Sequence, residues 1–104
     1  MAMIADVISK PVYQVLSDLT QEARIEVALP LAIKELLRLK LKETQQQRTS
    51  FEQRYKMDFA LFKSTWEAGN IPHPHSYAVE QDYWEWEATV TDERRLSEMH
   101  DRLL

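Results

Sequence analysis

The middle of the chain carries a repeat of apolar positions that predicts one long helix. After Leu31 the pattern runs through Ile33, Leu36, Leu37, Leu41, Thr44, Arg48, Phe51 and Tyr55, and its later steps are of four and three residues. This heptad-like spacing predicts a helix of about 25 residues whose stripe is apolar at its ends and polar in its middle. A small domain cannot cover so long a helix, so its first half is expected to pack on the N-terminal region or a second subunit. A stripe buried within one subunit explains the pattern equally well.

Two segments precede this helix. Ser9 and Pro11, followed by apolar residues at helical spacing, predict a short capped helix. Ile25, Val27 and Leu29 then alternate with charged or small residues, which is typical of a β-strand. No second strand is predicted, so this one would pair with its copy in a homodimer or with a strand from a partner.

The predicted dimerisation residues combine this strand with the start of the long helix. They are Ile25, Val27, Leu29, Ile33 and Leu37. The alternative is that residues 20–38 form one helix, in which Pro30 is a helix start or a kink.

Two further helices are predicted after Tyr55. Asp58 can cap a short helix that carries Phe59, Phe62 and Trp66 on one stripe and ends at Gly69. The prolines of residues 70–75 predict a loop, and Ser76 can cap a last helix. The apolar stripe of that helix changes phase between residues 89 and 92, which predicts a kink or a new helix start there.

These elements predict a mainly α fold of three to four helices, including one long helix and a short N-terminal strand for dimerisation. The expected division is an N-terminal arm, residues 1–30, and a helical domain, residues 31–104. The single glycine and four prolines among 104 residues agree with long helices and few turns.

Charge is distributed unevenly along the chain, although the net charge is only −4. Residues 1–56 carry nine Lys/Arg and seven Asp/Glu, whereas residues 57–104 carry four and ten. The two halves are therefore expected to meet different surfaces. The absence of cysteine, of a long apolar run and of a signal-peptide pattern favours a cytoplasmic protein that does not enter the membrane.

Candidate catalytic and metal-binding groups are few. His73 and His75 could be metal ligands, but the remaining histidine, His100, lies far along the chain, and zinc needs about four donors. No phosphate-binding glycine loop and no paired nucleophile and base are present. We therefore predict no enzyme activity, no cofactor, no metal and no small-molecule substrate.

The segment from Glu80 to Glu87 is the most unusual part of the sequence, because three large aromatic residues lie among four carboxylates. An aromatic anchor surrounded by carboxylates suits a basic cleft on another protein. The residues predicted to bind such a partner are Tyr83, Trp84, Trp86, Glu80 and Glu87. The alternative is that Trp84 only covers the loop or the preceding helix.

The same aromatic and acidic residues carry a resemblance to a known family. Its motif comprises Phe51, Tyr55, Met57, Phe59, Phe62, Trp66, Glu67, Gly69, Ile71, Pro72, His73, Ser76, Tyr77, Val79, Glu80 and the run from Asp82 to Ala88. This set resembles the antitoxins of prokaryotic type II toxin–antitoxin pairs, with the TumA-like proteins of cyanobacteria and archaea as the nearest group. The resemblance spans about residues 31–99 and departs at Lys56, where the family often has glycine.

The resemblance implies a cognate toxin, of a ribonuclease-like class, as the binding partner, and it implies that the complex can bind DNA of its own operon. Our first hypothesis is therefore a homodimeric antitoxin whose acidic half covers the basic site of a toxin. The second is a self-associating adaptor or assembly protein without a toxin. The third is a DNA-binding repressor, which predicts operator binding that weakens steeply with salt.

Overall fold

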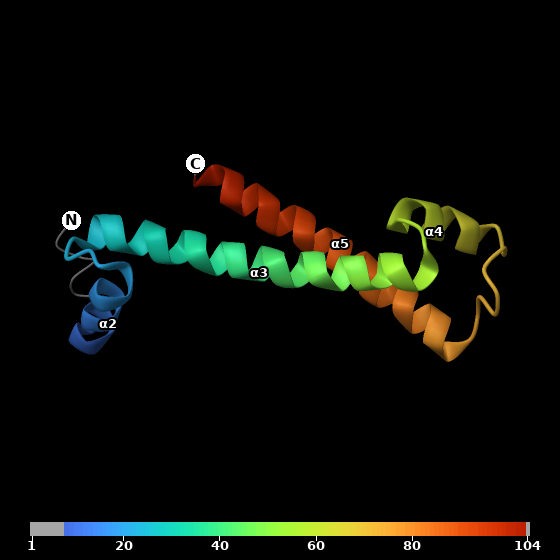
Figure 1. Ribbon diagram of the computed structural model, residues 1–104, viewed down its shortest axis with the longest axis horizontal. Coiled ribbons are helices and arrows are strands. Elements are labelled where there is room, and N and C mark those ends of the chain that lie inside the picture. The colour runs from blue at the N-terminus through green and yellow to red at the C-terminus, as the bar shows by residue number, and fades with distance from the viewer. Residues whose placement is uncertain (1–7, 104) are drawn as a thin grey trace.

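The structure, a computed structural model that describes residues 8–103, consists of four α-helices joined by short connections (Figure 1). The helices are α2 (Lys10–Thr20), α3 (Ile25–Tyr55), α4 (Phe59–Glu67) and α5 (Tyr77–Arg102). This confirms the prediction of a mainly α fold with one long helix. The arrangement is elongated, with a radius of gyration of 19.9 Å, where a compact domain of this length has about 13 Å.

The predicted N-terminal strand is wrong, and no strand occurs within residues 8–103. These residues, Ile25, Val27 and Leu29, instead lie in the first turns of α3. The helix also runs across the predicted boundary between the N-terminal arm, residues 1–30, and the helical domain, residues 31–104. A strand would need a partner for its backbone groups, whereas a helix satisfies them internally. Pro30 lies in the second turn of α3, and because proline has no N–H the helix continues there with one backbone hydrogen bond fewer.

The core lies where the end of α3, α4 and the start of α5 meet, at one end of the molecule (Figure 1). Its buried residues are mainly aromatic: Phe51, Phe62, Ile71, Tyr83 and Trp86. Partly buried neighbours complete it: Tyr55, Met57, Phe59, Trp66, Val79 and Val90. The stripe predicted for α4 therefore faces the core, as expected for three aromatic residues at helical spacing.

Local signals at the ends of α4 are confirmed. The Asp58 carboxylate accepts a hydrogen bond of 2.9 Å from the backbone N–H of Leu61, which satisfies one free amide of the first turn. Met57 packs against the cluster that contains Phe62, as a hydrophobic staple requires. Gly69 closes the helix with φ of +74°, in the left-handed region that glycine enters without strain.

Lys56 also adopts a left-handed conformation, with φ of +57°, directly after α3. Such a conformation costs about 1–2 kcal/mol for a residue with a Cβ. Glycine avoids this cost, but it loses more conformational entropy on folding, which costs about 0.5–1 kcal/mol. We therefore expect Lys56→Gly to raise the free energy of unfolding by about 0.5–1 kcal/mol, measured by urea denaturation. Lys56→Ala is the matched control, because it removes the same charge but keeps the Cβ. An equal gain in both variants would contradict the explanation.

Helix α5 runs unbroken from Tyr77 to Arg102, so the new helix start predicted between residues 89 and 92 is wrong. The apolar stripe changes phase because polar residues occupy positions that face α3. Thr89 is buried, and its hydroxyl donates to the backbone carbonyl of Glu85 at 2.8 Å. Glu93 forms an ion pair with Arg48 of α3 at 2.8 Å. Because these polar groups have hydrogen-bond or ion-pair partners, they can face α3 without interrupting the helix.

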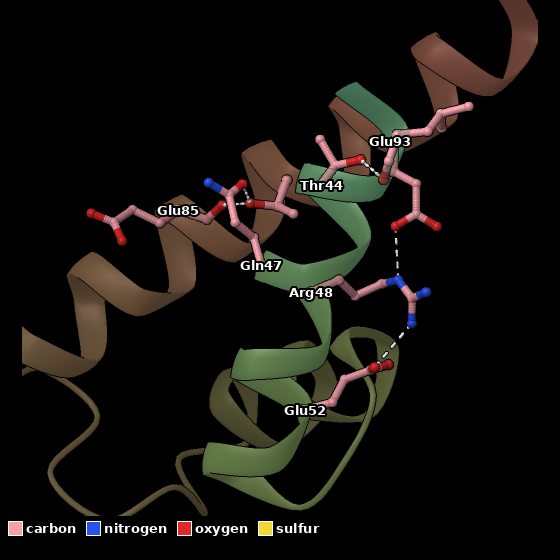
Figure 2. Close-up of polar contacts among 8 residues, drawn as sticks. Thr44, Gln47, Arg48, Glu52, Glu85 and Glu93 are labelled. Carbon is pink, nitrogen blue, oxygen red and sulfur yellow. Dashed lines mark hydrogen bonds and ion pairs between the residues drawn. The ribbon is translucent and has the colours of Figure 1, made fainter. Parts of the chain in front are cut away.

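These contacts form a polar layer halfway along the α3–α5 interface (Figure 2). Arg48 bridges Glu93 of α5 and Glu52 of its own helix, and the latter pair is 2.9 Å apart. Gln47 lies 3.5 Å from the Thr89 hydroxyl. The polar middle that the sequence predicts for the α3 stripe therefore faces a polar segment of α5, which fixes how the two helices align.

The opposite end of the molecule holds α2 against the first turns of α3 (Figure 1). The Tyr13 hydroxyl of α2 donates a hydrogen bond to the backbone carbonyl of Ala23, just before α3. Ala28, near the start of α3, is buried. Helix α5 ends near the middle of α3, so it leaves the first part of α3 uncovered. Among residues 8–103, no helix has the length and apolar character needed to cross a bilayer.

Candidate protein-binding site

The first three turns of α5 present an exposed aromatic surface. The hydroxyl of Ser76 caps the helix by accepting from the Val79 N–H at 3.3 Å. Tyr77 then starts the helix with 82% of its surface exposed, and Trp84 is 60% exposed. A spacing of seven residues places both rings on one face, about two turns apart.

Two carboxylates lie between and beside these rings. Glu80 and Glu87 are four residues before and three residues after Trp84, so both are its neighbours on the helix surface. We call Tyr77, Glu80, Trp84 and Glu87 the α5 ridge. Large exposed aromatic residues flanked by charge are typical of protein-binding surfaces.

The charges of the ridge are only weakly engaged within the chain. Glu80 lies 3.2 Å from Nδ1 of the exposed His75, and Glu87 accepts a long hydrogen bond of 3.5 Å from the Tyr83 hydroxyl. Neither carboxylate forms an ion pair with a Lys or Arg of residues 8–103. Both can therefore attract a basic surface.

Two of the five residues predicted to bind a partner lie in the core instead. Trp86 is fully buried among aromatic rings of α3 and α4, and Tyr83 stacks on Trp66 with ring centroids 4.5 Å apart. Their side chains cannot contact a partner while the core is folded. Tyr77 is not among the residues predicted from the sequence to bind a partner, although its position seven residues before Trp84 could have identified it.

The core gives the ridge a rigid base. The Trp84 ring meets the buried Tyr83 ring edge to face at 5.1 Å. The indole N–H of Trp66 donates to the carbonyl of Pro74 at 2.7 Å, and Ile71 is buried, so the loop before α5 is held on the core. A surface ordered before binding loses less conformational entropy when a partner docks.

Asp82 lies beside the ridge but is neutralised by α3. Its carboxylate forms an ion pair of 2.7 Å with Arg54 and accepts a hydrogen bond of 2.5 Å from the Tyr55 hydroxyl. The pKa of Tyr55 is raised to about 12, mainly by partial burial and secondly by this hydrogen bond. These contacts fasten the last turn of α3 to the second turn of α5.

The shifted pKa of Tyr55 predicts how stability changes at alkaline pH. The folded protein holds this proton more tightly than the unfolded chain, so the stabilisation is fully present below the unfolded pKa, near 10, and is lost as the pH rises to about 12. A phenolate absorbance titration should show a late phase that Tyr55→Phe reduces, and the buried Tyr83, whose pKa is raised mainly by burial, should account for the rest. Ionisation of all tyrosines in a single step near pH 10 would contradict this assignment.

Within residues 8–103, the histidines and carboxylates do not assemble into a metal site. His73 and His75 are exposed in the loop before α5, and His100 lies near the end of that helix. Across the described part of the chain, no three His, Cys, Asp or Glu side chains gather closely enough to hold a metal ion.

The residues predicted for dimerisation do not form one face. On a helix, Ile25 and Leu29 share a face, but Val27 points to nearly the opposite side. Leu37 is buried, and Ile33 is exposed. Only some of this set is therefore available to a second subunit.

Comparisons of the chain with protein-family models, with curated proteins and with solved structures found no match.

Proposed function

We propose that this protein is a binding protein without enzyme activity, whose α5 ridge covers a basic site on a second protein. The observation that carries the proposal is the exposure of Trp84 between Glu80 and Glu87, two carboxylates that no Lys or Arg of residues 8–103 neutralises. Tryptophan is the residue most enriched among those that dominate binding energy. Carboxylates around it favour a positively charged partner and speed the encounter.

A small toxin of the ribonuclease class is the partner we propose. The sequence resemblance supplies this class, and physical chemistry supports it, because an enzyme that binds RNA phosphates carries a basic site. Docking of a rigid aromatic and acidic ridge there would block access of the RNA. DNA binding would then belong to the complex, since the net charge of this chain is −4.

Coexpression with the product of the adjacent gene tests the proposal. We expect that product to arrest growth alone, to be harmless when coexpressed with this chain, and to copurify with it. Trp84→Ala should weaken the complex by about 2 kcal/mol or more, roughly 30-fold in Kd. Glu80→Gln combined with Glu87→Gln should slow association and reduce its salt dependence.

Leu61→Ala is the matched control, because Leu61 is an exposed apolar residue of α4 outside the ridge. It should leave the affinity unchanged. A harmless neighbouring product, or a complex that is insensitive to Trp84→Ala, would overturn the proposal.

A second candidate function is that of a self-associating adaptor. It is favoured by the apolar residues that α2 and the first half of α3 expose, at the end of the molecule opposite to the ridge. An adaptor would self-associate equally well but would neutralise no toxin, so the coexpression experiment separates the two functions.

A further inference from the structure

Helix α2 turns its most apolar side away from the helix on which it packs. Val12 and Val15 are each 57% exposed, and Leu19 is 78% exposed. Together with Pro11 and Leu16 they line a shallow apolar depression. An amphipathic helix normally buries this side, so a surface of this kind indicates a binding partner. We call Val12, Val15 and Leu19 the α2 face.

The first half of α3 carries an apolar stripe separate from the one that meets α5. Steps of four and three residues define it: Ile25, Leu29, Ala32, Leu36 and Leu39. It lies roughly a third of a turn around the helix from the stripe that includes Leu37 and Phe51. Its last two residues, Leu36 and Leu39, are exposed. We call these five residues the α3 stripe.

We propose that the α2 face of one copy packs on the α3 stripe of a second copy, reciprocally about a two-fold axis. The α2 face is short enough to lie along part of the α3 stripe, because Val12 to Leu19 spans about 10 Å of helix and Ile25 to Leu39 spans about 21 Å. A two-fold pair uses both surfaces twice, so each subunit's exposed α2 face and α3 stripe are covered together.

The exposed area of the chain agrees with a dimer. A compact monomer of 12.3 kDa exposes about 6,100 Å², whereas this chain exposes 7758 Å². The excess of roughly 1,600 Å² exceeds the ~800 Å² that each partner buries in a standard protein interface. A second copy can therefore cover the additional surface.

The charges of α2 argue against a lipid surface as the occupant. Helices that lie on membranes carry several Lys or Arg residues on the polar side. The polar side of α2 carries one cation, Lys10, and one anion, Asp18, beside Gln14 and Ser17. Such a side is suited to solvent at the outer surface of a dimer.

The mass of the purified protein in solution is the first test. Light scattering should give twice the chain mass, and Leu19→Asp or Leu36→Asp should reduce it to the chain mass. Leu61→Asp is the matched control, since Leu61 is a similarly exposed leucine of α4, and it should leave a dimer. Leu19 and Leu36 lie away from the aromatic core, and Leu61 of α4 is exposed, so tryptophan fluorescence should report an unchanged fold in all three variants.

Cysteine pairs give the second test, and the chain provides a clean background because it contains no cysteine. A mixture of Val15→Cys and Leu36→Cys subunits should oxidise to a disulfide-linked heterodimer. The control mixture of Gln14→Cys and Leu36→Cys should not, because Gln14 lies on the polar side of α2.

A monomeric wild-type protein would overturn the proposal. So would a dimer that survives Leu19→Asp, or one in which Val15→Cys links to its own copy rather than to Leu36→Cys. Binding to lipid vesicles in place of dimerisation would assign the α2 face to a membrane and also overturn it. None of these results affects the α5 ridge, which is tested separately through Trp84→Ala.

Discussion

Replacement of Trp86 by alanine should destabilise the protein by about 3–5 kcal/mol, whereas Trp84→Ala should change the free energy of unfolding by less than about 0.5 kcal/mol. The two tryptophans are separated by one residue on α5 but differ completely in burial. Trp86 is fully buried against Phe51, Phe59 and Phe62, with ring centroids between 5.0 and 5.5 Å apart. Its removal leaves a cavity that the rigid aromatic neighbours cannot fill.

The predicted loss from Trp86→Ala is a large share of the stability of a small domain, about 5–15 kcal/mol in total. Urea denaturation followed by circular dichroism measures both variants. Trp86→Phe should be less damaging than alanine, because it keeps most of the ring volume. It also removes the indole N–H, which is buried and has no hydrogen-bond partner within residues 8–103. Equal destabilisation by Trp84→Ala and Trp86→Ala would contradict the assignment of one ring to the core and the other to the ridge.

Most elements that depend on local chemistry were predictable from the sequence, although the predicted cap at Ser9 is wrong, since its side chain makes no capping hydrogen bond to α2. The cap at Asp58, the glycine stop at Gly69 and the cap at Ser76 each act over a few residues, and each appears as expected. The heptad spacing of α3 also sufficed, because most of that helix meets one neighbour, α5, along one stripe, while α2 contacts only its start.

The errors have physical causes of a different kind. Alternation of Ile25, Val27 and Leu29 is compatible with a strand, but it also occurs in a helix that is apolar on several sides. The interruption of the α5 stripe at Thr89 came from a polar layer, whose partners on α3 are more than forty residues away in sequence. Such distant compensation cannot be deduced from the pattern of one helix.

The candidate site was only partly predictable, because burial there also depends on contacts between elements that are distant in the sequence. Periodicity places Tyr83 and Trp86 on the inner stripe of α5 and Trp84 off it, and the packing of α4 and the loop seals both inner rings. Tyr77 lies at the very start of α5, where its exposure depends on the direction in which the loop enters the helix. Burial near helix ends is set by tertiary structure.

The proposals place two functions at opposite ends of an elongated molecule, whose longest dimension is 59 Å. A dimer formed through α2 and α3 would leave both α5 ridges free. Two partner molecules could then bind one dimer, and a partner with two basic sites would gain affinity through the effective concentration of the second ridge. Loss of the dimer should therefore weaken binding to a dimeric partner far more than binding to a monomeric one.

Replacement of Asp82 by alanine should destabilise the protein by about 1–3 kcal/mol. Its carboxylate is 16% exposed and joins two groups of α3, the Arg54 guanidinium and the Tyr55 hydroxyl. Without it, the partly buried hydroxyl loses its acceptor, and the last turn of α3 loses its polar connection to α5. Arg54 contributes less to the loss, because its half-exposed side chain can return to water.

Urea denaturation of Asp82→Ala measures this loss, with Glu85→Ala as the control. Glu85 is an exposed carboxylate one turn further along α5, and its hydrogen-bond partner there is Gln81 of the same helix. Its removal should change stability by less than about 0.5 kcal/mol. Asp82→Ala should also lower the pKa of Tyr55, because the hydrogen bond to the carboxylate is one cause of the shift, while burial keeps part of it. If Asp82→Ala unfolds at the wild-type urea concentration and leaves the pKa of Tyr55 unchanged, the carboxylate does not join the two helices.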